Sequence, residues 1–256
     1  MIFSYLHNFL FLKGRKVAGT SFEVALSKIC GAEDILTPIS PVDERYRIDL
    51  GYRHAQNFGA DPEKLEAYIE AVKTASANKF QKIEIPKGSI KNHCAFEEAW
   101  AFFGESLSGK RVIAIARNPY QTILSRLNHM AKFKGYQKSG RAMKASQQQL
   151  KAELTRFIGI LSNKSYPLNI TQYTPPRQAT IPLNVDYLRF EDLQADLNKF
   201  LANLEITESV ILPHLKKGQN LPVVAILEIA DSDQLAIIND YFDDEFKAFG
   251  YQKLEP

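Results

Sequence analysis

The stretch 8–23, NFLFLKGRKVAGTSFE, constrains the fold more than any other part of the sequence. Its apolar run Phe9–Leu12 has the length and content of a buried strand, and a basic turn follows. A helix is expected next, because Thr20 and Glu23 have the T-x-x-E spacing of a capping box and Gly31 would end the helix. A basic loop that opens onto a helix N-terminus gathers backbone N–H donors and the positive end of the dipole, which suits a phosphate.

The loop departs from the nucleotide P-loop pattern G-x-x-x-x-G-K-[ST] at one position. In Gly14-Arg-Lys-Val-Ala-Gly19-Thr20-Ser21, Thr20 stands where the lysine belongs, and the loop lysine is Lys16 instead. That lysine contacts the terminal phosphates in P-loop proteins, so an ordinary ATPase or GTPase interpretation is weakened. The alternative is that the segment is only a strand and a helix joined by a basic turn, and that it binds no ligand.

Composition favours a globular chain that forms a single domain over 1–256. Hydrophobic residues make up 45% and charged residues 24%, which is ordinary for a soluble protein. The net charge of +3 fits an anionic ligand, but the absence of a long Lys/Arg block gives no argument for nucleic acid. Cys30 and Cys94 are the only cysteines, which excludes a disulfide scaffold and a cysteine-rich zinc site. The five histidines form no convincing metal cluster in the sequence.

The first twelve residues, MIFSYLHNFLFL, differ from a secretory signal sequence. No basic region precedes the apolar residues, and His7 and Asn8 interrupt them, so we expect this segment to form the first strand. No apolar run approaches the roughly 18 residues that suggest a membrane-spanning helix. Together with the two-cysteine content, this predicts a cytoplasmic protein.

Alternation of strands and helices predicts an α/β fold, in which a central, mainly parallel sheet is flanked by helices in a P-loop-like arrangement of three layers. We expect strands at Phe9–Leu12, 111–117 and 185–188, and helices at 20–30, 62–78, 96–107, from Asn118-Pro119, 146–161, 190–204 and 234–249. The segments 32–60 and 162–182 are expected to be long loops, the second either functional or partly disordered. Ligands of such folds lie at the carboxyl ends of strands, where Lys16 and Arg117 are predicted.

A second strand–helix junction carries the pattern Arg117-Asn118-Pro119-Tyr120, with Ser125 eight residues after the arginine. Arginine presents a charged fork to phosphate, and a serine two helical turns later, on the polar face, can add one hydrogen bond. Alone, the pattern could be a helix cap beside a surface arginine.

Together the two junctions resemble the sulfotransferases that use 3′-phosphoadenosine 5′-phosphosulfate (PAPS). The first loop is similar to the K-x-x-G-T-S of the family's 5′-phosphosulfate loop, and the second junction to its 3′-phosphate motif R-[DN]-P with a following serine. The segments DYLRFEDL at 186–193 and FKAFGY at 246–251 resemble two further family segments. Their residues are expected mainly to pack in the protein interior, so they are weak evidence of function. The four matches follow the family's order.

The resemblance implies transfer of a sulfuryl group from PAPS to a hydroxyl acceptor, with a saccharide or glycoconjugate as the implied acceptor and adenosine 3′,5′-bisphosphate as the product. Lys16 would neutralise the leaving phosphate, and no metal is required because the sulfuryl group carries less charge than a phosphoryl group. The residues implied in nucleotide binding are Arg15, Lys16, Val17, Ala18, Gly19, Thr20, Ser21, Arg117 and Ser125.

The acceptor must lose a proton, and histidine is the usual base near neutral pH. His93 lies between the two phosphate motifs, where similar glycan sulfotransferases carry a catalytic histidine, and its pKa is expected at about 6 to 7. A helix-capping role for His93 and a catalytic role for His54, in GYRHAQNFG, remain alternatives. Cys94 beside His93 suggests a thiol–imidazole pair only weakly, since sequence neighbours rarely face each other. The basic loop 216–218 either covers the nucleotide or is simply solvated.

Two other classes of function stay open. A P-loop kinase or NTPase would bind MgATP in preference to the bisphosphate. A non-catalytic, sulfotransferase-like module would bind the bisphosphate without turning over an acceptor. The sequence does not identify the acceptor.

Overall fold

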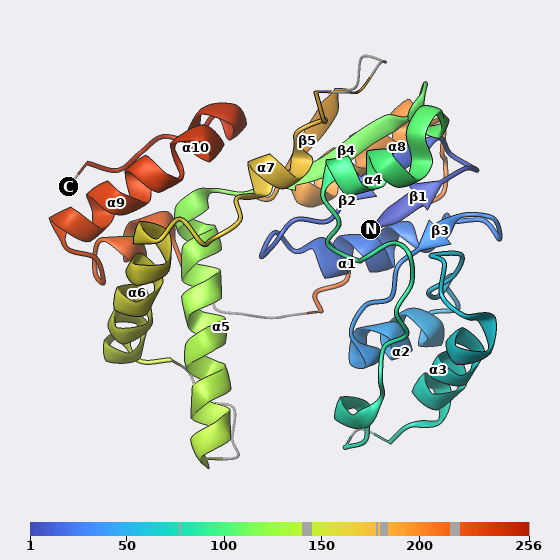
Figure 1. Cartoon of the computed structure of the whole chain (residues 1–256), viewed down its shortest axis with the longest axis horizontal. Helices are drawn as coiled ribbons and strands as arrows, with labels where there is room; N and C mark the ends of the chain where they lie inside the picture. Colours follow the sequence, from blue (N-terminus) through green and yellow to red (C-terminus); the bar gives the residue numbers. More distant parts are fainter. Residues whose placement is uncertain (77, 140–144, 178, 180–183, 216–220, 256) are drawn as a thin grey trace. The chain divides into compact units, whose positions relative to one another are not determined.

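A computed structural model describes the chain except at 77, 140–144, 178, 180–183, 216–220 and 256, and without the side chains of 133–139. Its contacts divide the chain into two compact units. Unit 1 comprises Met1–Ile115 and Gln172–Lys216, and unit 2 comprises Ala116–Thr171 and Lys217–Pro256. The single domain expected from the sequence stays a prediction. The segments of both units can be followed by their colours in Figure 1.

Unit 1 is built on a five-stranded sheet in the order β3-β1-β2-β4-β5. The strands are β1 (Ile2–Ser4), β2 (Phe9–Leu12), β3 (Ile35–Leu36), β4 (Arg111–Ala116) and β5 (Val185–Arg189). β1 runs antiparallel to both β2 and β3, whereas β2 and β4 are parallel. The α/β class is therefore confirmed, but the sheet is mixed where a mainly parallel one was predicted.

The antiparallel pairing arises because the first twelve residues form two strands, so the prediction of a single first strand is wrong. The chain reverses between Ser4 and Phe9, and Asn8 takes a left-handed φ of 52° that asparagine tolerates well. The carboxylate of Asp34 fixes the turn by accepting hydrogen bonds from the Ser4 hydroxyl at 2.9 Å and from the Tyr5 N–H at 2.7 Å. The polar break in the apolar run is thus a turn.

Helices cover both faces of this sheet (Figure 1). On one face, Phe9 and Phe11 pack against α1 (Gly19–Leu26) and α8 (Leu193–Asn203) in one buried cluster. On the other face, Phe3 stacks on Phe103, at the end of α4, with ring centroids 3.9 Å apart. Successive residues of a strand point to opposite faces of the sheet. The apolar residues of β1 and β2 therefore contribute to the core on both faces.

The predicted surface loop 32–60 contains β3 and α2 (Pro41–Asp49), so that prediction is wrong. α2 begins at a serine N-cap followed by proline and carries a fully buried ion pair, in which Arg47 Nη2 lies 2.6 Å from Glu44 Oε1. Charged residues in this segment suggested exposure. They are buried because each satisfies the other, and Glu44 also accepts the backbone N–H of Ala55 at 2.8 Å.

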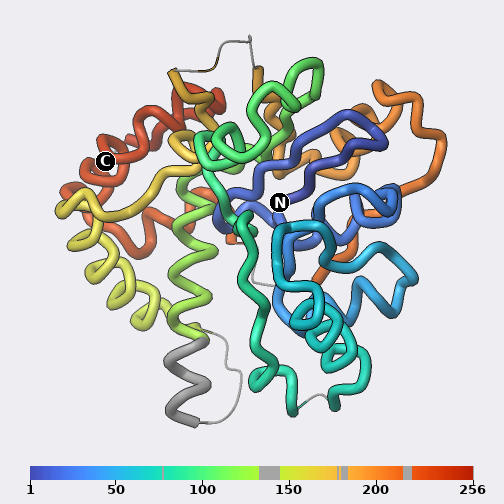
Figure 2. The backbone as a smooth tube through the Cα atoms, turned by 45° about the vertical axis from the view of Figure 1, so that its right-hand side comes forward, coloured from blue at the N-terminus to red at the C-terminus, as the bar shows by residue number. Residues whose placement is uncertain are grey.

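The remaining elements of unit 1 follow the sequence pattern more closely. They are α3 (Pro62–Thr74), η1 (Phe80–Lys82), α4 (Phe96–Phe103) and η2 (Gly104–Leu107). α3 begins at Pro62 as predicted, and the Asp61 side chain caps it by accepting the Lys64 N–H at 3.0 Å. The connection after η1 runs back along unit 1 to α4 (Figure 2), and His93 lies in this connection.

Unit 2 is helical. Its elements are α5 (Pro119–Ser139), α6 (Gln147–Ser162), η3 (Val223–Ile226), α9 (Ser232–Tyr241) and α10 (Asp243–Phe249), while α7 (Asn169–Tyr173) crosses the boundary between the units. The apolar side chains Tyr120, Ile123, Leu124 and Leu127 of α5 are buried in the core of this unit. The tail predicted as one helix is two, separated at Phe242, whose buried side chain packs in the same core. None of the described helices combines the length and apolar content needed to cross a bilayer.

Candidate functional site

The loop that follows β2 has an unusual backbone. Lys16 and Ala18 have φ values of 62° and 60°, in the left-handed region that residues with a side chain rarely adopt. Val17, between them, is 1% exposed and belongs to the core cluster of unit 1, so it anchors the loop. Left-handed residues in a turn point neighbouring N–H groups toward one place, which favours an anion.

The predicted capping box does not form at the start of α1. The helix begins at Gly19, and its N-cap Ala18 supplies no side-chain hydrogen bond. It ends at Leu26, before the predicted stop at Gly31. Within the helix, the first backbone N–H groups have no carbonyl four residues earlier to bond. An anion can satisfy such donors, and Thr20 and Ser21 lie in this first turn.

Glu23 forms a buried ion pair instead of a cap. Its Oε2 lies 2.5 Å from Lys13 Nζ, and both side chains are almost fully buried. Its Oε1 accepts the Asn92 amide at 2.8 Å and the α-amine of Met1. Burial alone would raise the pKa of Glu23, but the ammonium of Lys13 and the amine of Met1 hold that pKa at about 2. The carboxylate is therefore charged at neutral pH.

Lys13 is a residue of this site that the sequence analysis missed. Its side chain crosses the start of α1, where a Cβ on residue 19 would lie only 2.7 Å from Lys13 Cγ. Gly19 thus gives Lys13 the room to reach Glu23. The available signal was a lysine that directly ends the apolar run Phe9–Leu12.

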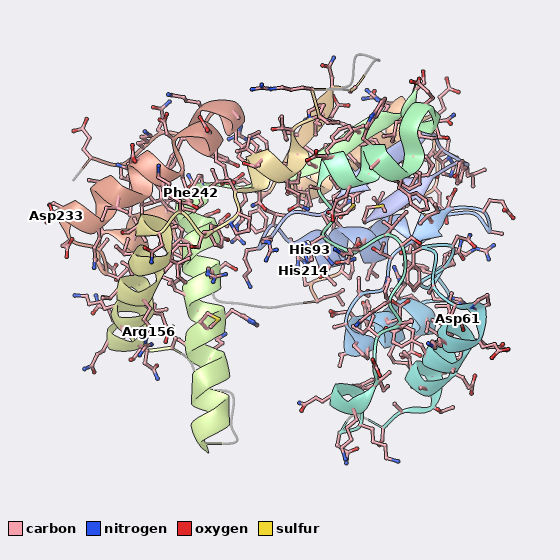
Figure 3. The ribbon with its side chains drawn as sticks, in the orientation of Figure 1. Asp61, His93, Arg156, His214, Asp233 and Phe242 are labelled. Atoms are coloured by element: carbon pink, nitrogen blue, oxygen red, sulfur yellow. The ribbon has the colours of Figure 1, made fainter. Side chains whose placement is uncertain are left out.

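His93 lies beside Lys13, the first residue of the loop. Figure 3 labels His93 next to α1. Its Nδ1 is 3.0 Å from the Lys13 carbonyl oxygen. A carbonyl only accepts hydrogen bonds, so Nδ1 carries the proton and Nε2 is the acceptor of the neutral ring. Burial, then the nearby Lys13 ammonium, lower the pKa of His93 to about 4. The imidazole is neutral at physiological pH.

The structure bears on His54 as the alternative base and on Cys94 as a nucleophile. His54 is half-buried, and its Nδ1 lies 2.9 Å from the carbonyl oxygen of Ala55, with no bond to the loop among the described contacts. The thiol of Cys94 is buried, and burial raises its pKa to about 11. A thiol protonated at neutral pH is a poor nucleophile. The basic loop 216–218 lies outside the described residues.

Arg117 and Ser125 belong to unit 2, whereas the loop, Lys16 and His93 belong to unit 1. Arg117 is the residue after β4, which is the parallel neighbour of β2. Its side chain is 9% exposed, and Ser125 is half-buried two turns into α5. The predicted helix start at Asn118 is confirmed, since its Oδ1 accepts the Tyr120 N–H at 3.0 Å. The 3′-phosphate roles stay predictions.

Near Ser125, α5 holds polar atoms that the sequence analysis did not single out. Gln121 Oε1, Thr122 Oγ1 and Asn128 Oδ1 are buried, and they have no hydrogen-bond partner within the described part of the chain. Folded proteins rarely leave such groups unpaired, so unexplained ones call for a water or a ligand. The available signal was the polar face of this helix, on which Ser125 also lies.

No group of three or more His, Cys, Asp or Glu side chains in the described ranges is arranged to hold a metal ion. No known family model, curated protein or solved structure matches this chain. The site therefore has to be interpreted from its own residues.

Proposed function

We propose that this protein transfers a sulfuryl group from PAPS to a hydroxyl group, with a saccharide or glycoconjugate as acceptor. The observation that carries the proposal is the first turn of α1, whose N-cap Ala18 supplies no side-chain hydrogen bond and which follows a loop with left-handed Lys16 and Ala18. Anions satisfy such a turn, and the sulfotransferase-like motifs around it support a phosphosulfate as that anion.

In this proposal the backbone N–H groups of Ala18 to Ser21 and the hydroxyls of Thr20 and Ser21 bind the 5′-phosphate. Lys13 contributes little charge to the ligand, because Glu23 already neutralises its ammonium. Lys16 is the lysine of the K-x-x-G-T-S pattern and is assigned to the leaving phosphate. Arg117 and Ser125 are assigned to the 3′-phosphate through a charged fork and a hydroxyl.

The chemical step is an in-line displacement at sulfur. The acceptor oxygen forms a new S–O bond while the bond from sulfur to the 5′-phosphate oxygen breaks, and adenosine 3′,5′-bisphosphate leaves. The acceptor proton passes to Nε2 of His93, the lone-pair nitrogen of its neutral ring. Lys16 stabilises the negative charge that develops on the departing phosphate, where catalysis gains most from a fixed charge.

A thermal-shift comparison of adenosine 3′,5′-bisphosphate, MgATP, MgGTP and adenosine tests the proposal. A ligand at about 100 times its dissociation constant adds about 2.7 kcal/mol of stability. We expect the bisphosphate to raise the melting temperature most at equal concentration, and adenosine to have no effect.

A larger shift with MgATP would contradict the proposal and favour a kinase or NTPase. The catalytic half is tested separately with labelled PAPS and a panel of mono- and oligosaccharides. Strong bisphosphate binding without transfer to any acceptor would point to a non-catalytic nucleotide-binding module.

A further inference from the structure

Gln172 joins two segments that lie far apart in the sequence. It is half-buried on α7, and its side-chain Nε2 donates to the carbonyl oxygen of Lys13 at 2.8 Å and to that of Cys94 at 3.0 Å. Both partners are carbonyls, which only accept, so the amide orientation follows from its contacts. All three residues belong to unit 1.

One of these carbonyls contacts the ring of His93, and the other belongs to the residue that follows it. The Lys13 oxygen also accepts the Nδ1–H of the ring at 3.0 Å, and Cys94 follows His93 in the chain. A carbonyl oxygen has two lone pairs, so it can serve both donors at once. One amide group thus holds the partner of the ring and the backbone next to the ring.

α7 is itself held in place beside this contact. The fully buried Tyr173, the neighbour of Gln172, donates its hydroxyl to the carbonyl oxygen of Ile115 on β4 at 3.3 Å. This bond ties the end of α7 to a central strand of unit 1. The Gln172 amide therefore starts from a rigid position, as a group that orients another side chain must.

We propose that Gln172 is a positioning residue, which through the Lys13 carbonyl keeps His93 as the Nδ1–H tautomer and leaves Nε2 as its only proton acceptor. The catalytic part of this inference rests on the proposed function. Among the described contacts of His93, the bond to Lys13 is the only hydrogen bond, so nothing else fixes the ring tautomer. A base in the wrong tautomer cannot take the acceptor proton, as the histidine of serine proteases illustrates.

The first test reads the tautomer directly and needs no activity. In the ¹⁵N NMR spectrum of histidine-labelled protein at pH 7, the His93 signals are assigned by their loss in His93→Asn. We expect a protonated Nδ1 and an unprotonated Nε2 in the wild type, and a mixture of both tautomers in Gln172→Leu. A wild-type ring protonated at Nε2 overturns the proposal, as do unchanged signals in Gln172→Leu.

The second test measures transfer from labelled PAPS and binding of adenosine 3′,5′-bisphosphate. In Gln172→Leu we expect kcat to fall about 10- to 100-fold, the range for partners that orient a functional side chain. The KM for PAPS and the affinity for the bisphosphate should not change. The matched control is Gln147→Leu, which removes a single amide-to-carbonyl bond on the surface of unit 2.

The two tests separate the inference from the function beneath it. The expected NMR result without any transfer by the wild type would leave the positioning role standing and reject the proposed function. Normal kcat in a transfer-active Gln172→Leu would reject the positioning role alone. If Gln172→Leu does not fold, Gln172→Met supplies both the NMR comparison and the kinetic comparison.

Discussion

Two lysines three residues apart have different environments in this structure. Lys13 is buried, and its charge is neutralised by Glu23 inside unit 1. Lys16 is half-buried in a loop whose backbone is left-handed at that residue. Because of these environments, Lys13 has a structural role, and Lys16 is the candidate for stabilising the charge on the leaving phosphate.

Lys16→Ala should remove transfer activity and leave the fold intact. Alanine and lysine bear similar strain at a positive φ, so the substitution changes the charge more than the backbone. Loss of one group that stabilises developing charge costs about 100- to 1000-fold in rate. Transfer from labelled PAPS measures the loss, a thermal melt checks the fold, and the exposed Lys87→Ala is the control. Near-normal turnover would exclude Lys16 from catalysis.

His93→Ala should abolish transfer while the affinity for adenosine 3′,5′-bisphosphate stays nearly unchanged, because the base contacts the acceptor. The structure also shifts the expected pH dependence of the transfer rate to lower pH. A base works when it is unprotonated, and burial lowers the pKa of His93 to about 4, below the 6 to 7 expected from the sequence. The wild-type rate should therefore stay level from pH 8 to about 5 and fall only as pH approaches 4. A limb between pH 6 and 7 that persists in His93→Asn would assign the base to another group.

At the scale of the element, the loop and the start of α1 combine two costs that stable proteins usually avoid. The loop holds residues with side chains at positive φ, and the helix begins without a side-chain cap. Sparsely populated backbone conformations persist where the surroundings impose them, and they cluster at functional sites. Here the buried Val17 and the Lys13–Glu23 pair supply that constraint.

Ala18→Gly should stabilise the protein by about 0.5–1 kcal/mol. A left-handed conformation costs an L-residue roughly 1–2 kcal/mol, and glycine relieves this cost but loses about 0.5–1 kcal/mol in chain entropy. The same substitution at the exposed Ala67, in the middle of α3, should instead destabilise by about 0.5–1 kcal/mol. Urea unfolding measures both variants. Destabilisation at both positions would show that Ala18 is not strained.

A second element-scale prediction concerns α10 in unit 2. Glu245 is 1% exposed, its Oε1 accepts the Ile170 N–H at 3.3 Å, and burial raises its pKa to about 7. The folded state therefore binds this proton more tightly than the unfolded state does, so stability should fall as pH rises from about 4.5 to 7. The slope for one such group is at most about 1.4 kcal/mol per pH unit.

Glu245→Gln should remove this part of the slope in urea unfolding at pH 5, 6 and 7. The exposed Glu228→Gln, in the same unit, should leave it in place. An identical slope in wild type and Glu245→Gln would show that the buried carboxyl keeps its ordinary pKa.

Elements with local periodicity were predictable from the sequence. The apolar run at 9–12 predicted β2. The polar residues Asp61, Ser146 and Asn118 stand at the starts of α3, α6 and α5. The errors share a cause in charged side chains that pair with each other in the protein interior. Glu23 looked like a helix cap but pairs with Lys13, and the charged segment 32–60 is structured because Arg47 and its partner satisfy each other.

The candidate site was predictable in part. The loop carries a motif, whereas the contacts that surround His93 do not. Lys13 contacts His93 across 80 residues of sequence, and Gln172 contacts Lys13 across 159. No local spacing encodes contacts of that kind.

For the whole molecule, the predicted phosphate contacts divide between the two units. Lys16 and Thr20 belong to unit 1, and Arg117 and Ser125 to unit 2. The proposed function assigns the 5′-phosphate to the first set and the 3′-phosphate to the second. This makes the discrimination between nucleotides a test at the largest scale.

Adenosine 3′,5′-bisphosphate should bind more tightly than AMP by about 10- to 100-fold. Hydrogen bonds to a charged group are worth about 1.5–3 kcal/mol each, and AMP leaves the 3′-phosphate contacts unmade. In calorimetric titration, Arg117→Ala should lose most of this preference, and Ser125→Ala a smaller part. If Arg117 serves only stability, its variant will melt earlier but keep the preference. Equal affinity of the wild type for both nucleotides would overturn the site.

The interrupted order of unit 1 has a consequence for how the chain is made. Its sheet face of Phe9, Phe11 and Ile113 is covered by α8, which the ribosome releases some 80 residues after β4. All of 116–171 emerges in between and contributes to the other unit. The nascent chain therefore carries the part of this apolar face that α1 does not cover through the synthesis of 116–171, and any truncated chain that stops before α8 keeps that part uncovered. Chaperone demand during synthesis, and aggregation of C-terminal truncations, follow from this interrupted order.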